Sequence, residues 1–129
     1  MPEPTIETMN QTLFTYRATC MRVVDGDTVD LNVDLGLRVH QHARFRLFGI
    51  DTPETYGVKK DSEEYKAGLA AKSRLAELIV GKELWIDTHK DETGKYGRWL
   101  ATVWVVLDKE VTNINELLVE EGHAEERSY

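Results

Sequence analysis

The sequence is poor in cysteine: Cys20 is the only one among 129 residues. A single thiol excludes an intrachain disulfide and a zinc site built from cysteines, so we expect the fold to be stabilised by packing, with Cys20 as a small buried side chain. Long apolar runs are also absent. No stretch approaches the roughly 18 to 20 residues that a membrane-spanning helix needs, so we expect no membrane association.

Basic residues are in the minority. Sixteen Lys and Arg against 23 Asp and Glu give a net charge of −7. Domains that hold nucleic acid through bulk electrostatics are usually basic, so nucleic acid binding would have to depend on local cations. The opening Met1-Pro2-Glu3-Pro4 lacks the basic start and apolar stretch of a secretory signal, so a cytoplasmic location is permitted.

The residue pattern predicts a loose N-terminal arm over residues 1–11 and a single domain over 12–129, a length that suits one hydrophobic core. The arm is polar and shows no periodicity. Beyond it, alternating or continuous apolar residues predict five strands, at Phe14–Asp25, Val29–Gly36, about Val39–Ile50, Leu84–Ile86 and Trp99–Leu107.

Two segments have the spacing of capped helices. The longer begins at Asp61, with Glu64 three residues on, and its apolar face comprises Ala67, Ala71, Leu75, Leu78 and Ile79. The shorter begins at Asn113, with Glu116 three residues on, and ends near Gly122. Five strands, a long helix between the third and fourth, and a short C-terminal helix favour an α+β fold, a five-stranded OB-fold β-barrel.

Two acidic turns follow predicted strands: Asp25-Gly26-Asp27-Thr28 and Asp51-Thr52-Pro53-Glu54. Together they can present hard oxygen ligands to a cation such as calcium. Each has a simpler interpretation when taken alone. Asp-Gly is a common hairpin signal, and the second segment also reads as a proline turn with solvated acids.

Three arginines lie near these turns. Arg44 and Arg46 are two residues apart, so they share one face of the third strand, and Arg98 follows a glycine-containing loop. Arginine binds phosphate through two parallel hydrogen bonds, so arginines beside clustered carboxylates are consistent with a phosphodiester site. The alternative is that they only pair with the surplus acids.

Histidines and tryptophans carry weaker signals. His40 and His42 alternate on one strand and indicate a polar surface better than a metal site. Tryptophans in apolar strands usually pack into cores, although Trp99 adjoins Arg98 and can stack on a base.

Four segments in order resemble the motifs of the staphylococcal nuclease (thermonuclease) family. They are Asp-Gly-Asp-Thr-Val from Asp25, Phe-Arg-Leu from Phe45, Ile-Asp-Thr-Pro-Glu-Thr from Ile50, and Lys-Tyr-Gly-Arg from Lys95. The similarity extends from about Tyr16 to Ala124. It implies the same barrel and calcium-dependent hydrolysis of DNA and RNA.

The resemblance also implies a role for each matching position. Asp27 and Asp51 would bind calcium directly, Thr52 through its backbone carbonyl, and Glu54 through water while serving as general base. The remaining matches would contact the substrate, with Arg46 and Arg98 on the phosphate and Lys95 and Tyr96 beside the nucleotide.

The chain departs from that family in charge and length. Well-known secreted members are basic, and longer members continue into another helix beyond the point that corresponds to Tyr129. The first difference weakens nonspecific attraction to polyanions and leaves a catalytically silent binding module as the alternative function. The second leads us to expect a homodimer that covers exposed apolar barrel surface.

Overall fold

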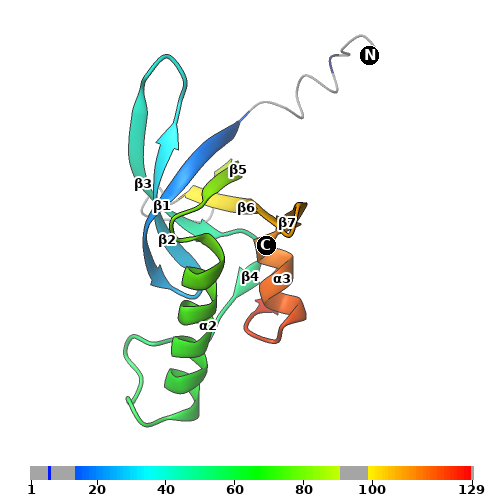
Figure 1. The fold of residues 1–129 in the computed structure, drawn as a ribbon. Coiled ribbons are helices and arrows are strands. Elements are labelled where there is room, and N and C mark those ends of the chain that lie inside the picture. The colour runs from blue at the N-terminus through cyan, green and yellow to red at the C-terminus, as the bar shows by residue number, and fades with distance from the viewer. Residues whose placement is uncertain (1–5, 7–13, 91–98, 129) are drawn as a thin grey trace.

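The computed structural model describes Ile6, residues 14–90 and residues 99–128 of the chain. Five of its strands form a closed barrel: β1 (Thr15–Asp25), β2 (Thr28–Asp34), β3 (His40–Leu47), β5 (Glu83–Lys90) and β6 (Trp99–Leu107). Neighbouring strands are antiparallel in the order β3-β2-β1-β5-β6, and parallel pairing of β3 with β6 closes the ring. The predicted five-stranded α+β barrel is confirmed (Figure 1).

Alternate residues of the strands fill the barrel interior. In β2, Val29, Leu31 and Val33 are buried, whereas the four polar residues that alternate with them are partly exposed. This is the period of two that the sequence shows, because successive strand side chains point to opposite faces. The alternation fails at the ends of the strands, where Phe14 is 62% and Leu35 42% exposed.

The long helix, α2 (Glu63–Ile79), packs against β1 and lies beneath the barrel in Figure 1. Its N-cap is Ser62, whose hydroxyl accepts a hydrogen bond from the backbone N–H of Tyr65, so the prediction of Asp61 as cap was wrong by one residue. The predicted apolar face also needs a correction, since Ala67 is exposed and Gly68 takes the buried position.

The predicted third strand is too long. β3 ends at Leu47, and the chain turns at Gly49, which has a φ of +78° that an L side chain rarely adopts. The short strand β4 (Ile50–Asp51) then leaves the barrel and pairs antiparallel with β8 (Glu125–Glu126), so that Asp51 lies opposite Glu125. A two-residue strand has no periodicity that the sequence can reveal.

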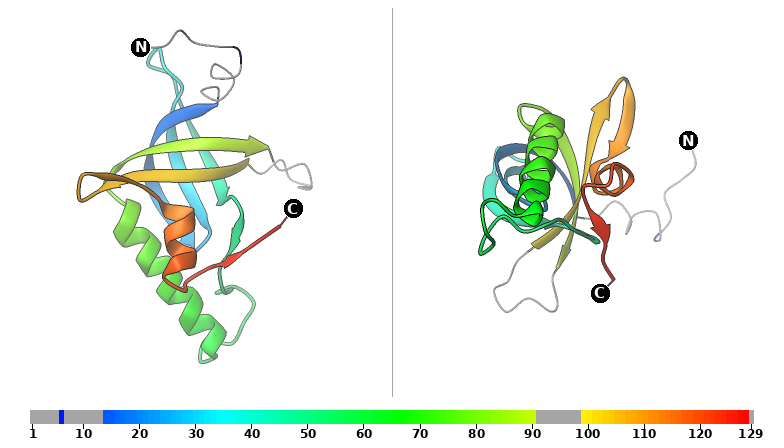
Figure 2. Two further views of the ribbon diagram at one scale, coloured as in Figure 1. Left: turned by 90° about the vertical axis from the view of Figure 1, so that its right-hand side faces the viewer. Right: turned by 90° about the horizontal axis from the view of Figure 1, so that it is seen from below.

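The short helix, α3 (Ile114–Glu120), is capped by Asn113 as predicted, after a strand β7 (Glu110–Asn113) that was not predicted. Buried Asn115 holds α3 in place. Its Oδ1 accepts a hydrogen bond from Val103 N at 3.0 Å, and its Nδ2 donates to Phe48 O at 2.9 Å and Ala101 O at 3.0 Å. These bonds tie α3 to β6 and to the turn before β4, beside which α3 lies in Figure 2.

Neither α2 nor α3, within the part of the chain that the structure describes, is long and apolar enough to cross a bilayer. Apart from Ile6, the predicted arm over residues 1–11 lies outside the described residues.

Candidate active site

Asp27 is held by donors from both acidic turns. The hydroxyl of Thr28 donates to Asp27 Oδ1 at 3.1 Å, and the backbone N–H of Thr52 donates to Asp27 Oδ2 at 3.3 Å. The carboxylate is only 11% exposed. Two turns that are 25 residues apart in sequence therefore share one hydrogen-bonded acid.

Gly26 allows this close approach. A Cβ at this position would lie 2.8 Å from Ala71 Cβ in α2 and 2.8 Å from Thr52 Oγ1. Both distances are shorter than real Cβ contacts, so no larger residue fits without movement of the helix or the second turn. The hairpin turn expected at Asp25-Gly26 is present, and the glycine is needed there for packing space.

Arg46 lies between the two aspartates. Its Nη2 atom is 3.6 Å from Asp27 Oδ2 and donates a hydrogen bond to Asp51 Oδ1. The Arg46 side chain is only 17% exposed, and its Nε has no hydrogen-bond partner among the described residues. The structure thus brings together Asp27, Arg46 and Asp51 as the sequence predicted.

A second arginine reaches Asp51 from the C-terminal segment. Arg127 Nη1 lies 3.4 Å from Asp51 Oδ1, and the Arg127 backbone N–H donates to Gly49 O at 2.8 Å. The sequence analysis missed this residue. No local pattern marks it, because the pairing of β4 with β8 alone brings it to the site.

The segment that carries Glu54 is held against α2 and the first turn. A Cβ at Gly68 would lie 2.7 Å from both Pro53 O and Thr55 Cγ2, and 3.1 Å from Glu54 O, so the loop packs directly on the helix backbone. In addition, the Thr55 hydroxyl donates to Asp25 Oδ1 at 3.2 Å.

Within that segment, Thr52 and Glu54 differ in exposure. Thr52 is buried, and its Oγ1 has no hydrogen-bond partner among the described residues. Glu54 is exposed, and no described side chain pairs with its carboxylate. A carboxylate in that position is accessible to water and substrate.

Arg44 has a different role from Arg46, although both lie on the outer face of β3. Arg44 makes a bidentate pair with Asp30, with Nε to Oδ1 at 2.8 Å and Nη2 to Oδ2 at 3.2 Å. The hydrogen bonds from Arg44 lower the pKa of Asp30. For Arg44 the simpler interpretation is correct, because this arginine pairs with a surface acid away from the two turns.

The carboxylate oxygens at the site are of the type that hard cations take as ligands. Oxygen atoms of Asp27 and Asp51 converge on one point, the Nη2 atom of Arg46, and calcium is bound mainly by carboxylate, carbonyl and water oxygens. In residues 14–90 and 99–128, no three acidic, histidine or cysteine side chains gather closely enough to enclose a metal. The described site therefore offers two converging carboxylates, with Glu54 in the adjoining loop. The predicted substrate residues Lys95, Tyr96 and Arg98 lie outside the described residues.

The closed barrel and the paired acidic turns around a half-buried arginine define the class of protein, and comparisons with known proteins agree. A family model described as "Staphylococcal nuclease homologue" matches residues 44–129. The thermonuclease of Staphylococcus intermedius is 35% identical over 108 residues, which cover 84% of this chain and 58% of that protein. The micrococcal nuclease of Shigella flexneri is 35% identical over 114 residues, with coverages of 84% and 57%.

The chain belongs to the staphylococcal nuclease family. Protein ParB of Escherichia coli is also similar, at 32% identity over 113 residues that cover 84% of this chain and 55% of that protein. The chain thus spans less than two thirds of the length of these relatives.

Proposed function

We propose that the chain is a calcium-dependent nuclease that hydrolyses phosphodiester bonds of DNA, RNA or both. The observation that carries the proposal is the convergence of Asp27 and Asp51 on the half-buried guanidinium of Arg46, beside a loop that presents Glu54 to solvent. Membership of a family whose named relatives include thermonuclease and micrococcal nuclease supports it.

The site residues divide the chemistry between charge stabilisation and proton transfer. Calcium would be held by Asp27 and Asp51, with the Thr52 carbonyl and a water-mediated contact from Glu54, and it would supply positive charge beside the scissile phosphate. Arg46, together with Arg98, would donate hydrogen bonds to the phosphate oxygens, where negative charge accumulates during attack. Lys95 and Tyr96 would lie beside the nucleotide.

Glu54 would orient the attacking water and accept its proton. A general base must reach the proton that it removes, and an exposed carboxylate with no described ion-pair partner is available for this task. The contacts of the loop with Gly68 and Asp25 limit the movement of Glu54. Arg46 is held by two carboxylates before substrate arrives, which reduces the reorganisation needed during the reaction.

A catalytically silent nucleic-acid or protein binding module is the alternative. The net charge of −7 favours it, because the chain lacks the basic surface that usually attracts a polyanionic substrate. The contact of Arg46 with Asp27 and Asp51, and the presence of Glu54 three residues beyond Asp51, favour catalysis.

The test is cleavage of single-stranded DNA and RNA with calcium and then with a chelator. We expect cleavage that requires calcium and falls about 100-fold to 10,000-fold in Glu54→Gln, which keeps the side-chain shape and removes the base. Glu110→Gln, an exposed change in β7, is the matched control and should cleave as the parent does.

Two outcomes would contradict the proposal. Equal rates for Glu54→Gln and the parent would assign the activity to another site or to a contaminant. A pure parent protein that binds single-stranded DNA without cleaving it would support the silent module.

A further inference from the structure

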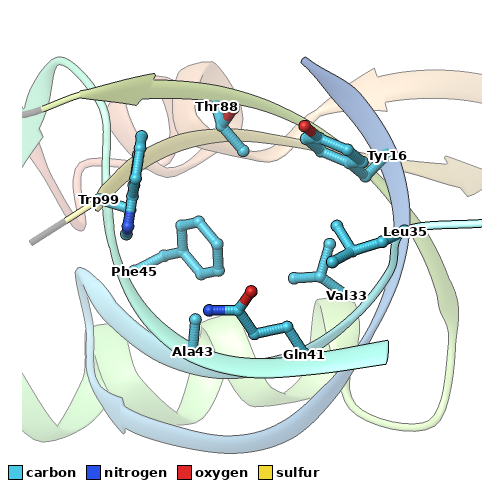
Figure 3. A pocket seen from close by; sticks show the side chains of 8 residues that line it. All are labelled: Tyr16, Val33, Leu35, Gln41, Ala43, Phe45, Thr88 and Trp99. Carbon is cyan, nitrogen blue, oxygen red and sulfur yellow. The ribbon is translucent and has the colours of Figure 1, made fainter. Parts of the chain in front are cut away.

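The barrel has a pocket on the face of β3 opposite the two arginines. Gln41, Ala43 and Phe45 alternate along β3 and line this pocket, whereas Arg44 and Arg46 project from the other face. Figure 3 shows the side chains arranged around an open centre inside the ring of strands. The mouth of a β-barrel is a common place for a ligand site.

The size of the pocket limits what it can hold. Its volume is about 140 Å³. An apolar protein cavity of about 150 Å³ binds benzene, so this pocket suits a single six-membered ring. A bicyclic purine would have to leave part of its ring system outside.

The lining combines aromatic surface with one polar side chain. Trp99 forms one wall and is 43% exposed, while Phe45 in the interior is 4% exposed. The amide of Gln41 points into the pocket in Figure 3, and it makes no hydrogen bond to any described residue. An amide offers both donors and an acceptor, as the edge of a nucleobase does.

The pocket and the proposed phosphate site lie on opposite faces of β3, one residue apart along the strand. Phe45 lies opposite Trp99 and Arg46 opposite Leu100 in the parallel register of β3 and β6. Trp99 also follows Arg98 directly in the sequence. Arg46, which we propose for phosphate, and Phe45, which lines the pocket, are therefore neighbours along β3 that project from opposite faces of the strand. An aromatic surface near a cation is the combination that single-stranded nucleic acid binding uses.

We propose that this pocket binds one pyrimidine base of a single-stranded nucleic acid, stacked on Trp99 and hydrogen-bonded to Gln41. The proposal rests on the proposed nuclease function and adds a base preference to it. A preference for pyrimidines follows from the single-ring volume.

The experiment measures binding without cleavage. Fluorescein-labelled dT8 and dA8 are titrated with the full Glu54→Gln chain, and anisotropy gives each Kd. We expect tighter binding of dT8, and Trp99→Ala should weaken it roughly 5-fold to 100-fold, the range that corresponds to loss of one stacked base. Trp99→Phe should retain most of the affinity.

Two further variants distinguish base recognition in the pocket from effects of substitution elsewhere in the barrel. Gln41→Ala should lower the ratio of dT8 to dA8 affinity, because it removes the group that contacts the base edge. Trp104→Phe is the matched control, since Trp104 donates to Asp87 at 3.3 Å and does not line the pocket. Circular dichroism of each variant confirms that it is folded.

The outcomes distinguish this proposal from the nuclease proposal. Equal affinity for dT8 and dA8 would overturn the proposal that the pocket binds a pyrimidine, even if the parent cleaves DNA. Unchanged dT8 binding in Trp99→Ala and Gln41→Ala would overturn it as well. If the parent never cleaves but binds pyrimidines in a way that depends on Trp99, the pocket proposal is supported and the nuclease proposal is contradicted.

Discussion

Two arginines on one face of β3 allow a direct comparison at the level of single residues. Arg46 lies between Asp27 and Asp51, whereas Arg44 is paired with Asp30. If Arg46 stabilises the transition state, Arg46→Ala should raise the barrier by about 2 to 4 kcal/mol, as loss of a preorganised donor does. Arg44→Ala should cost much less. The measurement is kcat/KM on single-stranded DNA for both variants.

Arg44→Ala is the matched control for that comparison, because it removes the same side chain two residues away. Similar rate losses at the two positions would contradict the separate roles and would indicate that both arginines act through the general charge of the strand.

At the level of the elements, Gly68 determines how closely α2 approaches the loop that carries Glu54. In Gly68→Ala, helix propensity improves by about 1 kcal/mol. The new methyl group meets the backbone oxygen of Pro53 at 2.7 Å, and overpacking of this kind costs about 1 to 3 kcal/mol. We therefore expect a net loss of stability together with slower cleavage, because the loop must move.

Chemical denaturation and cleavage rates check this prediction. Ser73→Ala is the control, since it introduces alanine at an exposed position of the same helix. A Gly68→Ala variant with higher stability and unchanged cleavage would show that the loop does not depend on this contact.

The two helices are joined by an ion pair that should give stability a dependence on pH. Arg74 in α2 bonds Glu121 after α3 in a bidentate way, with Nε to Oε1 at 2.7 Å and Nη2 to Oε2 at 2.8 Å. These hydrogen bonds lower the pKa of Glu121 below its ordinary value of 4.5. The pair therefore stabilises the fold above about pH 4.5, and this contribution is lost as the pH falls through the folded-state pKa.

Arg74→Ala should lower the free energy of unfolding at pH 7 by about 0.5 to 1 kcal/mol, because both partners are partly exposed to solvent. The difference from the parent should shrink below pH 4.5. Arg17→Ala breaks a more exposed pair with Glu83 at 3.4 Å and should cost less. A difference between parent and Arg74→Ala that grows toward low pH would contradict the assigned sign.

For the molecule as a whole, the homodimer expected from the sequence stays a prediction. Exposed apolar side chains at the β2–β3 turn supply one surface for it, with Leu35, Leu37 and Val39 exposed by 42%, 98% and 52%. Because association stabilises only the folded state, the melting temperature of a dimer should rise with protein concentration. A monomeric mass by light scattering, with a constant melting temperature, would exclude the dimer.

The amino-acid pattern alone was sufficient for the barrel, whereas the roles of the candidate residues were predicted from motifs that resemble those of the family. The period-two burial of β2 and the Asn113 cap follow from local physics, since side-chain direction and capping depend on near neighbours. Asp27, Arg46 and Asp51 lie in short motifs whose residue types already match the chemistry of a phosphate or a hard cation.

The tertiary structure decided which of these side chains meet. Arg44 and Arg46 are equivalent in the strand pattern, and the fold pairs one with Asp30 and places the other between Asp27 and Asp51. The same holds for Arg127, which reaches Asp51 through pairing between β4 and β8. A local pattern records which face of an element is buried, whereas contacts between distant segments depend on how closely two backbones pack.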